Sequence, residues 1–410
     1  MTEFLNLTPP DEALKRLLSH LEVHPVPEEV NTAQALGRVT VSPVLAPHPL
    51  PEFRRSTVDG FAVRAADTYG SSESLPAYLN LIGEVCMGQA TDLRLGAAQC
   101  ALIHTGGMLP EGADAVVMVE NTQSARENEV EVLRAVAVGE NLIKIGEDVK
   151  LGEEVIPAGR RLRPAEIGGL MALGFTTVMV ARKPRVGILS SGDEVIPPEQ
   201  QPLSGQVRDV NSFTLAAVVQ QVGGEAIHYG IIPDTRAAML KTARRAHAEC
   251  DVVVITAGSS VSVRDLTAEI IAELGQPGVL VHGVNIRPGK PTILGVCAGK
   301  PVIGLPGNPV SALVNVEMFV APVVKSLLGE DPARPRAAVN AQLLVNLASE
   351  SGREEWVPVR LLASSRGWEA DPVFGKSNLI FTLARADGLV RVVSDATGLA
   401  AGEMVEVVLF

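Results

Sequence analysis

The residues best placed for chemistry in this 410-residue chain stand in three turns between Lys183 and Leu328. Each turn follows a continuous apolar run: SSGDE follows RVGIL, AGSSVSVRD follows CDVVVIT, and PGNPVSA follows KPVIGL. Such runs suit parallel strands that are buried on both faces. Ligands bind at the carboxyl ends of parallel strands, where turns lead into helix N-termini. We therefore expect the three turns to meet at one ligand site.

The third turn has the features of an anion site. Asn308 is a preferred N-cap residue, Pro309 suits the first helical position, and Gly329 suits the helix end. The N-terminus of a helix presents free N–H groups and a partial positive charge, which favour a phosphate. The alternative is a strand–helix turn that binds nothing, and the turn by itself leaves both open.

Two cations precede this turn in NIRPGKPTIL, where Arg287 and Lys290 flank a Pro–Gly pair that limits their separation. They would supply local positive charge beside the strand ends, and both residue types bind phosphate well. The alternative is a pair of solvated surface cations, which is common for isolated Lys and Arg.

The acidic members of the turns are Asp193, Glu194 and Asp265. Carboxylates near bound phosphates make sense chiefly through a hard cation such as Mg²⁺, because bare carboxylates would repel the ligand. Glu194 and Asp265 are the candidate metal ligands. Asp265 has a second interpretation as the N-cap of the helix LTAEIIAELG, supported by Glu269.

A second group of polar turn residues lies between Phe53 and Ile145 and just beyond it. Asp59 precedes Gly60, Thr105 stands in IHTGG, Asp114 in EGAD and Asp148 in KIGEDV. Asp and Gly are the default turn residues, so each is a weak signal alone, and a structural role is the simplest interpretation of Asp114.

Composition limits the class of protein. Hydrophobic residues make up 46% and charged residues 20% of the chain, so it can bury large cores. A formal net charge of −12 argues against a nucleic-acid or anionic-membrane partner. No uninterrupted apolar stretch reaches the roughly 18 residues of a membrane span, and the N-terminal residues do not resemble a signal peptide. The scattered cysteines favour reduced thiols and a cytoplasmic location.

Several common enzyme classes lack their motifs here. Among the seven histidines, only His20 and His24 stand at HxxxH spacing and none at HxH spacing, and metal ligation by histidine is not expected. GxSxG, GxxxxGK[ST] and a GxGxxG after a strand are also missing from the sequence.

The coarse pattern predicts a multidomain protein of the α/β and β classes. We expect a small helical and linker domain from residues 1–50 plus 146–180, and a β-rich domain over 51–145. A three-layer α/β domain is expected over 181–330, where strand–turn–helix units repeat. Short strands with turns over 331–410 predict a C-terminal β-barrel-like domain.

Taken together, the motifs resemble the MoeA family of molybdopterin molybdenumtransferases, to which the E domain of gephyrin is related. The resemblance covers nearly the whole chain and keeps the family order. It is carried by STVDGFAV, GEVCMG, IHTGGMLPEGADAVVMVE, NLIKIGEDV, LRPAEIGGLMALG, KPRVGILSSGDEV, GQVRDVNSFTL, NIRPGKPT, GLPGNPVSA, GREEW and ADGL.

The resemblance implies a homodimer in which the α/β molybdopterin-binding domain of one subunit faces the β-rich domain of the other. It implies insertion of molybdenum from molybdate into adenylylated molybdopterin with release of AMP and a need for Mg²⁺, and a molybdopterin adenylyltransferase is a possible partner. The candidate catalytic residues are Asp59, Asp148, Glu194, Asp265 and Lys290. The candidate substrate-binding residues are Thr105, Ser190, Ser191, Gly192, Asp193, Gly258, Ser260, Arg287, Pro306, Gly307, Asn308, Pro309, Arg353 and Ser377.

The sequence departs from the family pattern at a few positions. AGSSVSVRD is less glycine-rich than the usual turn, Arg287 stands where lysine is common, and Lys376 precedes Ser377 where a small residue is usual. Three alternatives remain: a molybdopterin adenylyltransferase, a nucleotide-processing enzyme of the CinA type, and a non-catalytic scaffold or cofactor carrier like gephyrin.

Overall fold

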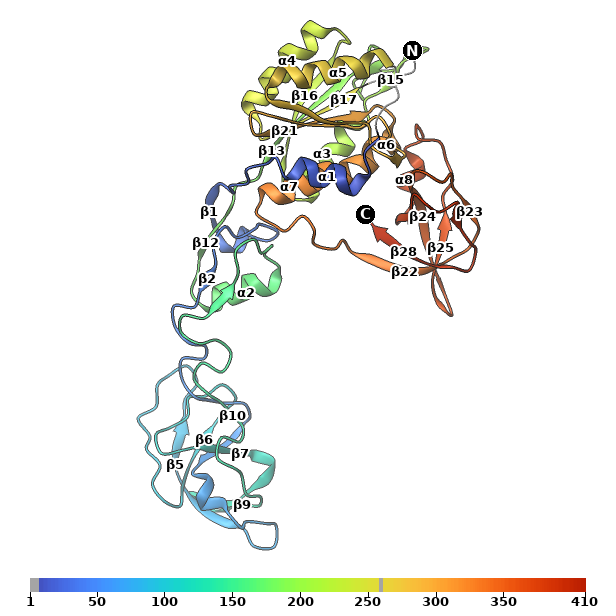
Figure 1. The fold of residues 1–410 in the computed structure, drawn as a ribbon. Helices are drawn as coiled ribbons and strands as arrows, with labels where there is room; N and C mark the ends of the chain where they lie inside the picture. The colour runs from blue at the N-terminus through green and yellow to red at the C-terminus, as the bar shows by residue number, and fades with distance from the viewer. Residues whose placement is uncertain (1–6, 258–260) are drawn as a thin grey trace. The chain divides into compact units, whose positions relative to one another are not determined.

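The computed structural model describes residues 7–257 and 261–410. The chain forms two compact units. The first comprises Met1–Ser42, Ala158–Arg163 and Thr177–Phe410, and the second comprises Pro43–Pro157 and Pro164–Thr176. Each unit is described separately below, with the labels of Figure 1.

A six-stranded sheet forms the centre of the first unit, in the order β16-β13-β17-β21-β20-β18. The first four strands are parallel, β20 is antiparallel to β21, and β18 is antiparallel to β20, so β20 alone runs in the opposite direction within this sheet. The strands are β13 (Arg185–Ser191), β16 (Glu225–Ile232), β17 (Val252–Ala257), β18 (Pro277–His282), β20 (Ile293–Cys297) and β21 (Lys300–Pro306). The three apolar runs of the sequence are therefore the adjacent parallel strands β13, β17 and β21, as predicted.

Helices cover both faces of this sheet and make the domain three-layered (Figure 1). One face carries α4 (Arg236–Glu249) and α5 (Val261–Leu274). The other carries α1 (Pro10–Leu18), α3 (Asn211–Gln221), α6 (Pro309–Asn315), the π-helical segment η4 (Val316–Val320) and α7 (Ala321–Leu327). The predicted helix end at Gly329 is confirmed, since α7 stops two residues earlier and Gly329 has a φ of +83°.

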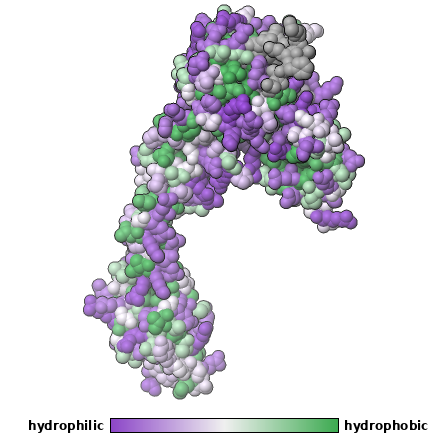
Figure 2. All heavy atoms as spheres, in the orientation of Figure 1, coloured by the Kyte–Doolittle hydropathy of each residue, from purple (hydrophilic) through white to green (hydrophobic). Residues whose placement is uncertain are grey.

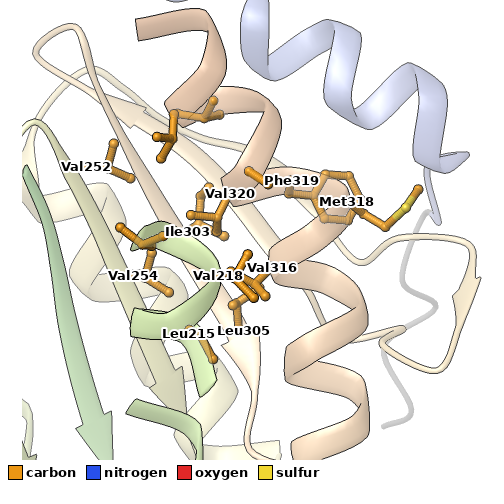
Figure 3. Packing of buried hydrophobic residues seen from close by; sticks show 14 of the residues in the cluster. Leu215, Val218, Val252, Val254, Ile303, Leu305, Val316, Met318, Phe319 and Val320 are labelled. Atoms are coloured by element: carbon orange, nitrogen blue, oxygen red, sulfur yellow. The ribbon is translucent and has the colours of Figure 1, made fainter. Parts of the chain in front are cut away.

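The core on the α3 and α7 face is built from branched aliphatic side chains around Phe319, which is fully buried (Figure 3). Burying each such side chain stabilises the fold by about 1.5–3 kcal/mol. Pro309–Leu327 is apolar and long enough to cross a membrane by composition, but 67% of its window is buried inside this domain. The stretch therefore packs as a core helix.

The C-terminal part of the first unit is a closed barrel. Its strands pair in the ring β24-β25-β22-β28-β26, and β26 returns to β24. They are β22 (Ala338–Leu343), β24 (Glu354–Ser364), β25 (Gly367–Pro372), β26 (Gly388–Val392) and β28 (Met404–Leu409). The short strand β19 (Ile286–Arg287) joins β24 from the α/β domain. A two-stranded ladder of β23 (Leu347–Ala348) and β27 (Gly398–Leu399), and α8 (Phe381–Ala384), lie in the same part of the chain.

An antiparallel ladder of β1 (Pro27–Asn31) and β12 (Thr177–Ala181) completes the first unit. Two further short strands, β14 (Val195–Ile196) and β15 (Val207–Arg208), pair in parallel after β13. In the space-filling view, hydrophilic residues cover most of the face shown and hydrophobic residues appear in small groups (Figure 2).

The second unit contains a six-stranded sheet in the order β7-β4-β6-β5-β9-β8. Apolar clusters pack against it in two groups, one around Val117 and one around Ile103. The strands are β4 (Gly60–Val63), β5 (Ala77–Val85), β6 (Gln99–Ile103), β7 (Ala115–Met118), β8 (Thr122–Arg126) and β9 (Glu129–Val132). The same unit holds the short ladders of β2 (Val44–Leu45) with β11 (Glu154–Ile156) and of β3 (Arg55–Ser56) with β10 (Leu142–Ile143).

A short helix in the second unit, α2 (Pro164–Ala172), begins at its proline and is followed by Gly174 with a φ of +80°. The α/β and β multidomain class is confirmed. The C-terminal barrel and the three-layer α/β domain are the two parts of the fold that define this class.

Candidate active site

A cavity of about 570 Å³ opens at the carboxyl ends of β13 and β21, and we call it the strand-end cavity. Residues of the first and third predicted turns line it together with Thr256 from β17. Ser190 and Ser191 are buried at the end of β13, and Glu194 is exposed on the following turn. The cavity is lined by Ser190, Ser191, Glu194, Val195, Pro202, Val207, Arg208, Asp209, Val210, Asn211, Thr256, Gly307, Asn308, Pro309, Asn378 and Ile380.

The turn after β13 is held by Asp234. The Ser191 hydroxyl donates to Asp234 Oδ1 at 2.8 Å, and the Asp234 N–H donates to Asp193 Oδ1 at 3.3 Å. Gly192 has a φ of +146°, and a Cβ there would meet the carboxylate of Glu194 at 2.8 Å. Glycine thus allows the chain to turn back so that Glu194 reaches the cavity, whereas Asp193 lies outside the cavity lining and supports the turn.

Asn308 occupies the predicted N-cap position of α6, but its side chain makes no capping bond. Its Nδ2 instead donates to the Ser377 hydroxyl at 3.0 Å, and the Val310 N–H donates to the Ser377 carbonyl at 3.0 Å. The barrel-side segment at Ser377 therefore takes one of the helix N–H groups that we expected to be free for an anion. Pro306, the last residue of β21, does not line either cavity described here.

A second cavity of about 860 Å³ lies between the α/β domain and the barrel, and we call it the cation cavity. Asn308 and Asn378 line both cavities, so the two adjoin. Cationic side chains enter the cation cavity from two segments: Arg287 and Lys290 from one, and Lys376 from the other. Glu355 is the carboxylate in its lining.

Arg287 is not a freely solvated cation. Strand pairing of β19 with β24 sets it opposite Glu355, and its Nε lies 3.4 Å from Glu355 Oε1. The Arg287 side chain is 50% exposed, so one face of the guanidinium stays open to the cavity. Neither Lys290 nor Lys376 has an ion pair among the residues that the structure describes, and both line the cation cavity.

Buried Asn315 holds the loop that carries these two cations. Its Nδ2 donates to the carbonyl groups of Pro288 at 3.2 Å and Ser311 at 2.7 Å, and its Oδ1 accepts from the Thr292 hydroxyl at 2.9 Å. Asn315 and Thr292 are both fully buried. Gly289, with a φ of +120°, passes so close to Asn315 that a Cβ would collide with the amide. The loop conformation is therefore fixed from beneath by a satisfied polar network.

Other candidates of this unit lie elsewhere. Ser377 lines the cation cavity, while Arg353 lines neither cavity. Gly258 and Ser260 fall outside the described residues, as does the side chain of Asp265. The backbone corrects one interpretation: α5 begins at Val261, so Asp265 lies inside the helix and is not its N-cap. The helix includes VSVRD, which the sequence pattern places in the turn.

In the second unit, Asp59 and Thr105 form a compact exposed pair. Asp59 Oδ1 accepts from the Thr105 N–H at 2.7 Å and from the Thr105 hydroxyl at 3.1 Å. These bonds, with the nearby His104, hold the pKa of the Asp59 carboxyl below its ordinary value. His104 contacts a second carboxylate as well, with its Nε2 3.0 Å from Glu84 Oε1.

The remaining acids of this unit differ in role. Asp148 is exposed, and its N–H donates to the Leu50 carbonyl at 3.0 Å. Asp114 Oδ1 accepts from the Ala65 N–H at 2.6 Å, which is the structural role expected for it.

Comparison with known proteins identifies the family of this chain. The profile of the MoeA N-terminal region (domain I and II) matches residues 8–174, that of the probable molybdopterin binding domain matches 187–326, and that of the MoeA C-terminal region (domain IV) matches 340–410. This chain belongs to the MoeA family.

Relatives align over almost the full length. A putative molybdopterin biosynthesis protein of Methanocaldococcus jannaschii is 35% identical, with 98% of each chain covered. The molybdopterin molybdenumtransferase of Bacillus subtilis is 31% identical, with 98% of this chain and 94% of the relative covered. The crystal structure of the molybdopterin biosynthesis MoeA protein from Pyrococcus horikoshii OT3 is 32% identical and superposes with a TM-score of 0.87, covering 99% of this chain and 100% of the other.

Sequence reasoning missed three residues that the geometry brings to the sites of this MoeA protein: Asn211 and Asn378 in the strand-end cavity, and Asn315 under the cation loop. A fourth residue, His104, was considered in the sequence only as a metal ligand, on the basis of histidine spacing. The position of Asn211 in DVNSF at a helix start was the one available signal, because the other contacts depend on how distant segments pack.

Proposed function

We propose that this MoeA protein is a molybdopterin molybdenumtransferase that inserts molybdenum from molybdate into adenylylated molybdopterin and releases AMP. The observation that carries the proposal is the pair of adjoining cavities at the strand ends. One is lined by hydroxyl, amide and carboxylate groups with a single cation, Arg208, and the other carries three cations. The reaction has two anionic substrates that must meet, and the two cavities share Asn308 and Asn378.

The strand-end cavity is the proposed site of the adenylylated pterin. Ser190 and Ser191 offer hydroxyl groups, and the helix α6 begins at its wall, so phosphate oxygens placed there would find donors. The same turns contain the other residues that we propose contact the adenylylated pterin: Gly192, Gly258, Ser260, Gly307 and Pro309.

The carboxylate of Glu194 at this cavity suits a hard divalent cation, because Mg²⁺ prefers oxygen ligands and commonly binds through one or two carboxylates plus phosphates. Glu194 and Asp265 are the proposed ligands. When bound, Mg²⁺ would offset the negative charge that develops as the phosphoanhydride bond is cleaved and AMP leaves.

The cation cavity is the proposed entry site of molybdate. Arg287, Lys290 and Lys376 bring positive charge to its lining, which suits a dianion in a protein of net charge −12. The Ser377 hydroxyl, at the seam with the strand-end cavity, would be positioned to bind an oxyanion as it passes between them. Arg353 and Pro306 are the remaining proposed substrate contacts, and both lie outside the linings of the two cavities.

Asp59, Thr105 and Asp148 are proposed to act from the second unit of a partner subunit in a homodimer. Asp59 is exposed and its carboxylate is held ionised by Thr105, so it is available to a ligand. We place the reaction in the cytoplasm, where the free thiols of all four cysteines would stay reduced. A molybdopterin adenylyltransferase would supply the adenylylated substrate.

The test is an assay of the purified protein with adenylylated molybdopterin, molybdate and Mg²⁺, with AMP and pterin-bound molybdenum measured together. The proposal expects AMP release that depends on molybdate and matches the molybdenum incorporated. Pterin binding with no AMP release at any molybdate concentration would instead favour the carrier interpretation.

A further inference from the structure

Asn211, the first residue of α3, has a polar atom that nothing in the described part of the chain satisfies. Its side chain is 8% exposed, and its Oδ1 has no hydrogen-bond partner among the described residues. Its Nδ2 donates to the Gly307 carbonyl at 2.8 Å. That bond fixes the orientation of the amide, because the flipped amide would set two oxygen atoms against each other. A buried carbonyl oxygen without a donor is destabilising, and natural proteins rarely keep one without a reason.

The surroundings of this oxygen indicate what would bind it. Asn211 lines the strand-end cavity beside the apolar side chains of Val195, Val207, Val210 and Ile380. These apolar side chains suit the face of a flat heterocycle, and the Asn211 oxygen suits an N–H group at the edge of that ring.

The acceptor is also held rigidly. Asp209 Oδ1 accepts from the Ser212 N–H at 3.1 Å, and its Oδ2 accepts from the Ser212 hydroxyl at 2.6 Å, which anchors the start of α3. The bond from Asn211 to Gly307 then ties this helix to the turn after β21. An acceptor fixed on two sides loses little conformational entropy when a ligand binds.

We propose that Asn211 Oδ1 accepts a hydrogen bond from the N–H edge of the substrate heterocycle and so orients that ring in the strand-end cavity. The inference rests on the proposed function, whose substrate carries two such rings, a pterin and an adenine. A ring that presents an acceptor at this edge would set that acceptor against the Asn211 oxygen with no hydrogen between them, so Asn211 would also discriminate between rings.

The test compares Asn211→Leu with Ser71→Ala. Leucine has a similar size but has no acceptor. Ser71 Oγ is the other buried side-chain atom without a partner in the described residues, and it lies in the second compact unit. Ser71→Ala therefore controls for the removal of an unsatisfied polar atom as such. Affinities for molybdopterin and for AMP are measured separately by titration calorimetry, and the Tm of each free protein is measured alongside.

The inference expects Asn211→Leu to weaken one of the two ligands about tenfold, with the other affinity and both affinities of Ser71→Ala unchanged. A loss confined to molybdopterin assigns the contact to the pterin ring, and a loss confined to AMP assigns it to adenine. Unchanged affinity for both ligands, or an equal loss for both with a lowered Tm, would show that Asn211 serves only to tie α3 to the turn. A wild-type protein that binds both ligands but releases no AMP would sink the proposed function and leave this contact standing.

Discussion

The strand-end cavity and the cation cavity adjoin, yet the chain builds them in different ways. The first is formed mainly by turns that directly follow buried parallel strands, so its polar groups are fixed by local sequence and sheet topology. The second is formed where the loop of residues 287–291, the start of α6 and the barrel segment of residues 373–378 pack together. This contrast fits the proposal that the strand-end cavity binds the organic substrate and that the cation cavity binds the small oxyanion.

Among the variants that would distinguish the roles of the two cavities, Lys290→Ala is expected to have the largest effect. It removes one of the two lysines in the lining that have no ion pair among the described residues, so kcat/KM for molybdate should fall about 10- to 100-fold while KM for adenylylated molybdopterin changes little. Steady-state kinetics with each substrate varied in turn give the comparison. Lys241→Ala, an exposed lysine on α4, is the matched control and should behave as wild type. Equal losses for both substrates would show that Lys290 serves a shared site.

A somewhat smaller effect is expected from Asn315→Leu, which acts on the cation cavity from below. Without the amide, the carbonyl groups of Pro288 and Ser311 lose their donor and the Arg287–Lys290 loop can shift. We expect the half-saturating molybdate concentration to rise about tenfold, together with a lower Tm from the buried groups left unpaired.

If Asn315 positions the cation loop, its replacement should change KM for molybdate as well as Tm, whereas replacement of a purely structural residue should change Tm alone. A drop in Tm with unchanged KM for molybdate would contradict its positioning role. Asn315→Asp keeps the size but places a carboxylate against the two carbonyl groups, so it should be at least as harmful as leucine.

The predictability of the two cavities from sequence also differs. Strands β13, β17 and β21, and the turns after them, follow from apolar runs ended by small residues, which is a local pattern. The closeness of Arg287 to Glu355 depends on β19 joining a barrel strand 68 residues later in the chain, and no local pattern encodes that pairing. Asn308 illustrates the limit: its position at the helix start was predictable, but its bond to Ser377 was not.

The same limit applies to α5 and to His104. The start of α5 was placed too late because VSVRD carries β-branched residues and follows a small-residue turn, although the packed helix begins at Val261. His104 has no histidine partner near it in sequence, and its contacts with Glu84 and Asp59 appear only when β6 pairs with β5 and with β4.

Asn308→Ala would test the boundary that Asn308 and Asn378 form between the two cavities, and a moderate effect on kinetics is expected. The change removes the amide that donates to the Ser377 hydroxyl and leaves the Val310 N–H bond to the Ser377 carbonyl in place. Because Asn308 lines both cavities, we expect KM for both substrates to rise about three- to tenfold. An effect on one substrate alone would mean that the seam belongs to that cavity.

The smallest expected effect is a shift in pH dependence from Thr105→Val. In the wild type, the pKa of Asp59 is lowered first by the Thr105 N–H bond and next by the Thr105 hydroxyl bond. Valine keeps the N–H bond and removes the hydroxyl bond, so the pKa should move upward toward its ordinary value. The carboxylate is then lost at a higher pH as the solution is acidified, and the acid limb of the activity profile should move to higher pH. A limb that stays in place would show that Asp59 ionisation does not limit activity.

The most direct test of separate cavities is the affinity for molybdate, measured by titration calorimetry for the wild type, Lys290→Ala and Asn211→Leu. The account predicts weaker binding in Lys290→Ala and an unchanged affinity in Asn211→Leu. Equal weakening in both variants would contradict it, because the two cavities would then act as one undivided site.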